Sequence, residues 1–172
     1  MQFYKYIEFT EIGNFMKITL LFTGKTKPDY LRQGVADYTR RIGHFVSLEI
    51  IEIQDQRKTG QVPGKKIMEY ERDRIMNRLG PEDFVILLDE RGTQLSSAEL
   101  AGTIEEKAMQ SVKKLVFVTG GAFGFDQKVY DRANMLLSVS KMTFSHQLIR
   151  ILFLEQLYRA FTMIKGHPYH HG

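Results

Sequence analysis

Three short segments of the sequence carry chemically distinctive side chains at the ends of apolar runs, two of them with glycines and the third just before a predicted helix. They are Leu87–Gly92 (LLDERG), Thr119–Gly124 (TGGAFG) and Val139–His146 (VSKMTFSH). Glycines let a ligand approach the backbone closely, and backbone amides at the start of a helix can bind an acceptor group. These segments indicate a pocket for a small polar ligand. The alternative is that the glycines only make turns and that Thr143 or Ser145 only caps a helix.

Several familiar sites do not fit these segments. The glycines of Gly120–Gly124 lack the spacing of the dinucleotide-binding fingerprint, and no glycine-lysine-serine or glycine-lysine-threonine run forms a phosphate loop. Ser145 and His146 are neighbours, but no nucleophile elbow surrounds the serine, which argues against a serine hydrolase. The tail has three histidines without a carboxylate nearby, so we expect no metal site there. These histidines are His167, His170 and His171.

The composition is that of an ordinary globular domain, with 172 residues, 43% hydrophobic and 26% charged. The absence of cysteine excludes disulfides and thiolate chemistry and suits a reducing compartment, so we expect a cytoplasmic protein. No apolar run is long enough to span a membrane. The net charge is +4, and residues 57–78 hold seven basic against three acidic side chains. This basic zone could contact a polyanion, or it could be a solvated helix face.

The pattern predicts five strands that alternate with five helices. Strands are expected at residues 17–23, 45–53, 84–88, 114–119 and 135–139, and helices at 28–41, 65–79, 96–110, 126–134 and 145–165. Such alternation calls for an α/β fold, a parallel sheet with helices on both faces. Ligands bind beyond the carboxyl ends of the strands in such sheets, where all three segments would meet. We expect one domain over residues 16–172. Residues 1–15 would be an N-terminal extension, because the regular pattern begins only at Met16. Glu8 and Glu11 within them do not suit a signal peptide.

The last predicted helix is apolar around most of its circumference, including Leu152 and Phe161. A helix of this kind must be covered on both sides. We expect a second subunit to provide part of the cover through a two-fold interface, the alternative being deep burial within one chain.

Three separated stretches of the sequence resemble one known family. MKITLLFTGK begins at Met16, FVTGGAFGF begins at Phe117, and LSVSKMTFSHQLIRILFLEQLYRAFTMIKGHPYHHG runs from Leu137 to the end. They are similar, in order and spacing, to the SPOUT-class ribosomal RNA large subunit methyltransferase H family. The resemblance covers residues 16–172, and the N-terminal extension is the one clear departure from it.

The resemblance implies a parallel-sheet fold whose C-terminal part forms a deep trefoil knot, and a homodimer that uses S-adenosylmethionine. The implied substrate is a pseudouridine in the helix 69 loop of 23S ribosomal RNA, methylated at N3 within the assembled ribosome. The residues that would hold the cofactor, matched by motif, are Leu88, Gly120, Val139, Ser140, Lys141, Met142, Thr143 and Phe144.

No residue is an obvious general base for removing the N3 proton. His146, Tyr169 and His170 are candidates by side-chain chemistry only, and for the two histidines a structural or RNA-contacting role is the favoured alternative. For RNA contact we expect Arg150, Tyr169 and His170, with a helix-surface salt bridge as the alternative for Arg150. The rival function is a basic ribosome-associated factor that holds a nucleotide without turning it over. An oxidoreductase is disfavoured by the glycine spacing.

Overall fold

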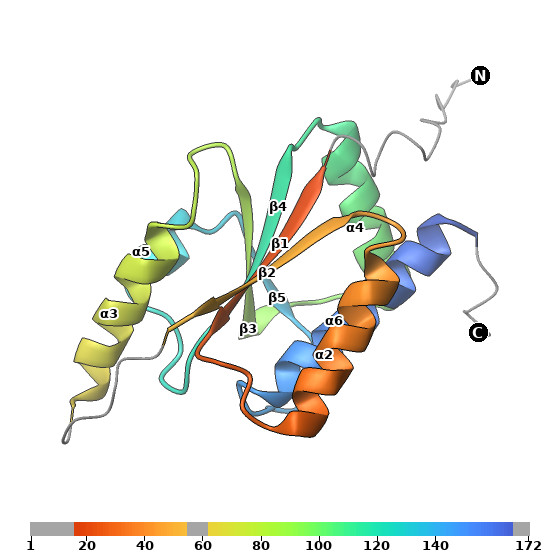
Figure 1. The fold of residues 1–172 in the computed structure, drawn as a ribbon. Coiled ribbons are helices and arrows are strands. Elements are labelled where there is room, and N and C mark those ends of the chain that lie inside the picture. The colour runs from red at the N-terminus through yellow and green to blue at the C-terminus, as the bar shows by residue number, and fades with distance from the viewer. Residues whose placement is uncertain (1–15, 55–61, 167–172) are drawn as a thin grey trace.

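Strands and helices alternate throughout the computed structural model, which describes residues 16–54 and 62–166 (Figure 1). The expected extension at 1–15 and the tail at 167–172 lie outside the described residues. The elements, labelled as in Figure 1, are β1 (Lys17–Thr23), α2 (Asp29–Ile42), β2 (Ser47–Ile53), α3 (Gly64–Met76), β3 (Phe84–Gln94), α4 (Ser97–Met109), β4 (Lys114–Thr119), α5 (Gln127–Arg132), β5 (Met135–Ser138) and α6 (Leu148–Ile164).

The strands form a single sheet of five in the order β2-β1-β4-β3-β5, and every neighbouring pair is parallel. The predicted parallel α/β architecture is therefore confirmed. Side chains of β1 alternate between two cores, because Leu20 and Phe22 pack beneath α2, α4 and α6, whereas Leu21 packs beneath α3 and α5. Both faces of the sheet are covered in this way (Figure 1), which is why the central strands are short, continuous apolar runs.

β3 departs from the prediction that it ends at Leu88. Leu88 and Thr93 both pair with Leu137 of β5, so residues 89–92 leave the ladder and return to it. A Cβ atom at Gly92 would lie 2.5 Å from the backbone of Leu137, so only glycine allows the backbone of β5 to pass this close to residue 92. Local disruptions of this kind bend a strand and redirect its side chains. We call residues 89–92 the β3 excursion.

α6 lies between α2 and α4 on one face of the sheet (Figure 1). Phe161 is fully buried in the monomer core, where its ring stacks on Phe45 at a centroid distance of 6.3 Å. The expectation that Phe161 needs a second subunit to cover it is therefore wrong, because two helices and the sheet cover α6 within one chain. At its start the helix does leave Leu148 exposed, at 37%.

No helix within residues 16–54 and 62–166 is both long and apolar enough to cross a bilayer.

Candidate functional site

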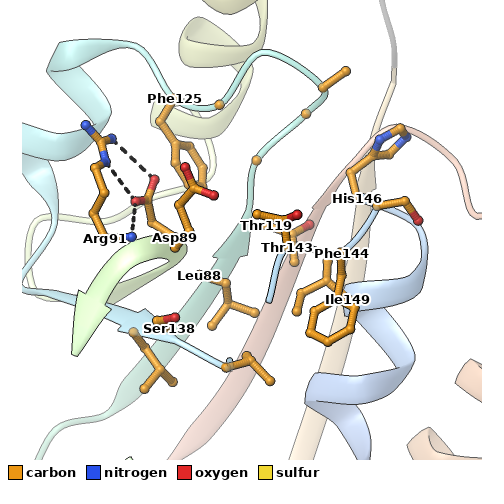
Figure 2. Close-up of a pocket in the computed structure, with 18 of the residues that line it drawn as sticks. Leu88, Asp89, Arg91, Thr119, Phe125, Ser138, Thr143, Phe144, His146 and Ile149 are labelled. Atoms are coloured by element: carbon orange, nitrogen blue, oxygen red, sulfur yellow. Dashed lines mark hydrogen bonds and ion pairs between the residues drawn. The ribbon is translucent and has the colours of Figure 1, made fainter. Parts of the chain in front are cut away.

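A cavity of about 910 Å³ opens at the carboxyl ends of β4 and β5 and beside the β3 excursion (Figure 2). All three segments that the sequence singled out contribute to its wall, as expected from a parallel sheet. Figure 2 shows Asp89, Arg91 and Phe125 on one side and Thr143, Phe144 and His146 on the other. Its size lies within the usual range of small-molecule sites, about 300–1,000 Å³.

The glycine turn after β4 brings bare backbone to the cavity. A Cβ atom at Gly120 would lie 3.3 Å from the ring of Phe125, and one at Gly121 would lie 2.5 Å from the buried Glu71 carboxylate. Neither position has room for a side chain without displacing a neighbour. Leu88, the last residue before the β3 excursion, adds an apolar surface beside them.

The loop between β5 and α6 is held by its own hydroxyl groups. The Ser138 hydroxyl donates to the Ser140 carbonyl at 2.9 Å, and the Met142 amide donates to Ser140 Oγ at 2.9 Å. Ser145 Oγ accepts from the Leu148 amide, the first amide of α6, at 3.2 Å, although Gln147 is the N-cap residue of the helix. These hydrogen bonds hold the loop in a defined shape at the wall of the cavity.

Most of the residues expected to hold a cofactor meet at this cavity. Its lining includes Leu88, Gly120, Val139, Ser140, Met142, Thr143 and Phe144. Lys141 is exposed and does not line it. The apolar surfaces of Leu88, Phe125 and Phe144, together with the bare glycine backbone, fit a flat heteroaromatic ring that also needs a few amides and carbonyls.

The β3 excursion adds a charged cluster that the sequence analysis missed. The Asp89 carboxylate accepts from Tyr130 Oη at 2.5 Å, from Arg91 Nε at 3.0 Å and from the Arg91 amide at 3.0 Å. The guanidinium of Arg91 also stacks over the Tyr130 ring at 4.6 Å. The one signal of this cluster in the sequence is Asp89 and Arg91, two residues apart and just after a buried apolar run. Their tyrosine partner lies 41 positions away from Asp89 in the chain, which no local pattern reveals.

The pKa shifts of Asp89 and Tyr130 favour an ionised Asp89 and a protonated Tyr130 at neutral pH, so the ion pair with Arg91 stays intact. Burial alone would raise the pKa of Asp89, but the hydrogen bonds from Arg91 and Tyr130 outweigh burial and lower it. Burial and the hydrogen bond to Asp89 raise the pKa of Tyr130 to about 12, so its hydroxyl stays protonated and keeps donating.

Arg150 is not at the surface, which corrects its expected role in RNA contact. Its side chain is fully buried, and its Nη2 and Nη1 donate to the Thr23 carbonyl at 2.6 Å and to Thr26 Oγ1 at 2.8 Å. Its Nε donates to the His146 carbonyl at 3.0 Å, and its guanidinium lies over the Phe22 ring. Arg150 therefore fastens the start of α6 to the end of β1.

The three candidate bases fall into two groups. His146 lines the cavity and is half-buried. Tyr169 and His170 lie outside the described residues, as do the other tail histidines. Within residues 16–54 and 62–166, no three histidine or acidic side chains gather in a way that could hold a metal ion.

Comparison with known proteins agrees with this geometry. A model of the family described as "Predicted SPOUT methyltransferase" matches residues 16–170. Proteins named "Ribosomal RNA large subunit methyltransferase H" are similar to the chain over nearly their whole length. The one from Bacteroides fragilis is 44% identical over 156 residues, 91% of this chain and 99% of that protein. The one from Streptococcus suis is 40% identical over 158 residues, 90% of this chain and 99% of that protein. The match along almost the entire chain confirms the resemblance, and the chain belongs to the SPOUT methyltransferase family.

Proposed function

We propose that this chain is an S-adenosylmethionine-dependent ribosomal RNA methyltransferase. Its proposed target is N3 of a pseudouridine in the helix 69 loop of 23S ribosomal RNA, within the assembled ribosome. Two observations support the class of reaction: the family match and the printed names of the relatives. The observation that carries the proposal is the cavity, which gathers Leu88, Gly120 and the loop after β5 at one edge of the sheet.

The cavity has the features that an adenosyl group requires. Leu88 and Phe144 offer apolar surface, and the backbone of Gly120 can be approached because no side chain intervenes. S-adenosylmethionine, when bound, supplies a methyl group on a positively charged sulfur. The contribution of the chain is alignment, because in-line displacement requires the attacking nitrogen to face that carbon, and orientation lowers the barrier substantially.

Replacement of Gly120 by valine should weaken cofactor binding strongly while the fold is retained. The added side chain would meet the Phe125 ring, since a Cβ atom alone already lies 3.3 Å from it. We expect S-adenosylmethionine affinity, measured by calorimetry, to fall at least about tenfold, which is roughly 1.4 kcal/mol of binding free energy. Gly102→Val on α4 is the matched control, because a Cβ atom there would meet nothing within 4 Å. Wild-type affinity in Gly120→Val would place the cofactor elsewhere.

The acceptor nitrogen must lose its proton for the reaction to occur. His146 is the described candidate for this role, because it lines the same cavity, and Tyr169 and His170 of the tail are the other two. A general base has to come within hydrogen-bond distance of the proton that it removes. Tyr169 and His170 are also proposed to contact the RNA, the tyrosine by stacking on a base and the histidine by hydrogen bonding.

We further propose a homodimer, a trefoil-knotted C-terminal part and a single domain over residues 16–172 preceded by an extension. Because its substrate is the ribosome, we place the protein in the cytoplasm. A groove of about 540 Å³ beside α6 supports a dimer surface, with Leu152, Leu95 and Leu100 in its wall. Exposed Leu148 lies at the start of the same helix.

Leu152→Glu tests the dimer surface without disturbing the monomer core. Leu152 is only half-buried in the monomer and lines the groove, so a charge there opposes association more than folding. We expect monomers by light scattering, with the circular dichroism spectrum unchanged. The exposed Tyr30→Glu on α2 should leave the dimer intact. A Leu152→Glu dimer of wild-type affinity would place the interface elsewhere, and Phe161→Glu cannot test this point because it would disrupt the core.

The test of the function is direct methyl transfer. Ribosomes that lack the modification would be incubated with the protein and isotope-labelled S-adenosylmethionine, and the nucleosides of 23S ribosomal RNA would be identified by mass spectrometry. We expect N3-methylpseudouridine from assembled ribosomes and little from free RNA. Ribosomes in which the target remains uridine are the control. Cofactor binding without any methyl transfer would favour the rival, a factor that holds a nucleotide at the ribosome.

A further inference from the structure

One arginine at the rim of the cavity is held in place but remains open to solvent. The Arg91 side chain is 65% exposed, whereas its partner Asp89 is 9% exposed. Exposed arginines usually sample many rotamers and contribute little through surface ion pairs. Arg91 is different, because the Asp89 carboxylate accepts hydrogen bonds from both the side chain and the backbone amide of Arg91. The Tyr130 ring lies beneath the Arg91 guanidinium.

This arrangement leaves the guanidinium able to bind another anion. An arginine has five N–H donors, and Asp89 engages Nε and Nη2 at 3.0 and 3.4 Å. The remaining donors lie on an exposed group whose position is already fixed. Preorganisation of this kind reduces the conformational entropy lost on binding.

The neighbouring rim suits a nucleic acid more than a small ligand. Phe123, on the glycine turn, is 53% exposed, and it packs against the start of α3, since a Cβ atom at Gly64 would lie 2.9 Å from its ring. The next two residues, Lys65 and Lys66, are exposed members of the basic zone. A fixed guanidinium, an exposed ring and two lysines on adjoining segments are groups that contact phosphates and unstacked bases.

We propose that Arg91 binds a phosphate of the RNA substrate at the rim of the cavity, with Asp89 and Tyr130 as the residues that position it. The proposal rests on the proposed RNA substrate and specifies how it is held. A guanidinium binds phosphate oxygens through paired hydrogen bonds, which lysine cannot reproduce. Glu90 also lines the cavity, so the contact depends on the geometry of this arginine and not on a uniformly positive surface.

The competing ligand is the carboxylate of the cofactor itself, which presents similar oxygens. Arg91 belongs to the wall of the cavity, but its side chain is 65% exposed, and this exposure favours a phosphate that approaches from solvent over a carboxylate held inside the cavity. The two possibilities differ in their salt dependence. The logarithm of ribosome affinity falls linearly with the logarithm of salt concentration. Loss of a phosphate contact makes this fall shallower by about one unit of slope, whereas loss of a cofactor contact leaves the slope unchanged.

The experiment measures the affinity of the full chain for ribosomes at several salt concentrations and, separately, its affinity for S-adenosylmethionine. For Arg91→Gln we expect ribosome affinity at low salt to fall about tenfold, with the salt slope reduced by about one and cofactor affinity unchanged. Arg91→Lys keeps the charge and should lose about threefold with the slope retained. The matched control is Arg40→Gln on α2, because Arg40 forms a comparable exposed pair with Asp37 at 2.7 Å. It should behave as wild type.

The outcomes separate this proposal from the proposed function. An unchanged salt slope in Arg91→Gln, alongside a wild-type protein that methylates ribosomes, overturns the role of Arg91 and leaves the function standing. Weakened cofactor binding with normal ribosome binding also overturns it and assigns Arg91 to the cofactor carboxylate. A wild-type protein that neither binds nor methylates ribosomes overturns both proposals.

Discussion

Replacement of Arg150 by alanine should destabilise the whole domain, by roughly 3–5 kcal/mol. The side chain is fully buried, and its removal leaves the Thr23 carbonyl and the Thr26 hydroxyl without their donor. Thr26 in turn donates to Glu52 Oε1 at 2.6 Å, so the loss also weakens the connection to β2. Because typical domains are stable by only about 5–15 kcal/mol, such a loss is a large fraction of the total.

The measurement is thermal or denaturant unfolding of the purified variant. For a chain of this length we expect the melting temperature to fall by roughly 6–20 °C. Arg159→Ala on the same helix is the matched control, because its side chain is half-exposed and pairs with Glu155 one turn away. That pair should contribute about 0.5 kcal/mol. Equal stability of the two variants would mean that water replaces the buried guanidinium without cost.

Deletion of residues 166–172 should remove methylation while the folded dimer persists. The tail has too few apolar residues to fold alone, yet it carries an aromatic ring and imidazoles suited to RNA. The family model extends to residue 170, through Tyr169 and His170. We expect the methylation rate on ribosomes to fall at least about a hundredfold, the scale of a general acid-base contribution. Cofactor affinity should change little, and Tyr169→Ala alone should reproduce most of the loss.

Removal of only His171 and Gly172 is the matched control and should leave the rate unchanged. A second experiment asks which subunit the tail serves, because it follows the helix proposed for the dimer. Tail-deleted chains would be mixed with Gly120→Val chains, so that one partner supplies the pocket and the other the tail. Recovered methylation means that the tail acts on its partner's cavity. If the simple deletion methylates at the normal rate, the tail is only a chain end.

The strands and the helix caps were accessible from sequence because their determinants are local. β1, β4 and the first part of β3 are buried on both faces, so each is a continuous apolar run whatever its neighbours are. The helix α4 begins where Ser96 and Glu99 predicted, since these two residues bond each other's backbone amides. The cavity followed from topology, because parallel strands bring their carboxyl ends to one edge.

Features that depend on distant partners were not accessible. The second part of β3 is polar and contains glycine, and only its pairing with β5 makes it a strand. Arg150 was placed at the surface because an arginine on a helix is usually solvated, whereas this one finds acceptors more than 120 residues earlier in the chain. The sequence also does not reveal that α2 and α4 flank α6, and so it cannot show that Phe161 is covered within one chain.

The pairing of β1 with β4 has a consequence for how the chain folds during its synthesis. The Thr23 hydroxyl donates to the Thr119 carbonyl at 2.8 Å, a bond between residues 96 positions apart. Parallel pairing over such a distance makes loop closure entropically costly and folding slow. During synthesis β1 and β2 can pair first, but the inner edge of β1 stays open until Thr119 has been translated. A nascent chain therefore carries an exposed apolar strand for most of its synthesis, which makes it a natural client for chaperones that shield open strand edges.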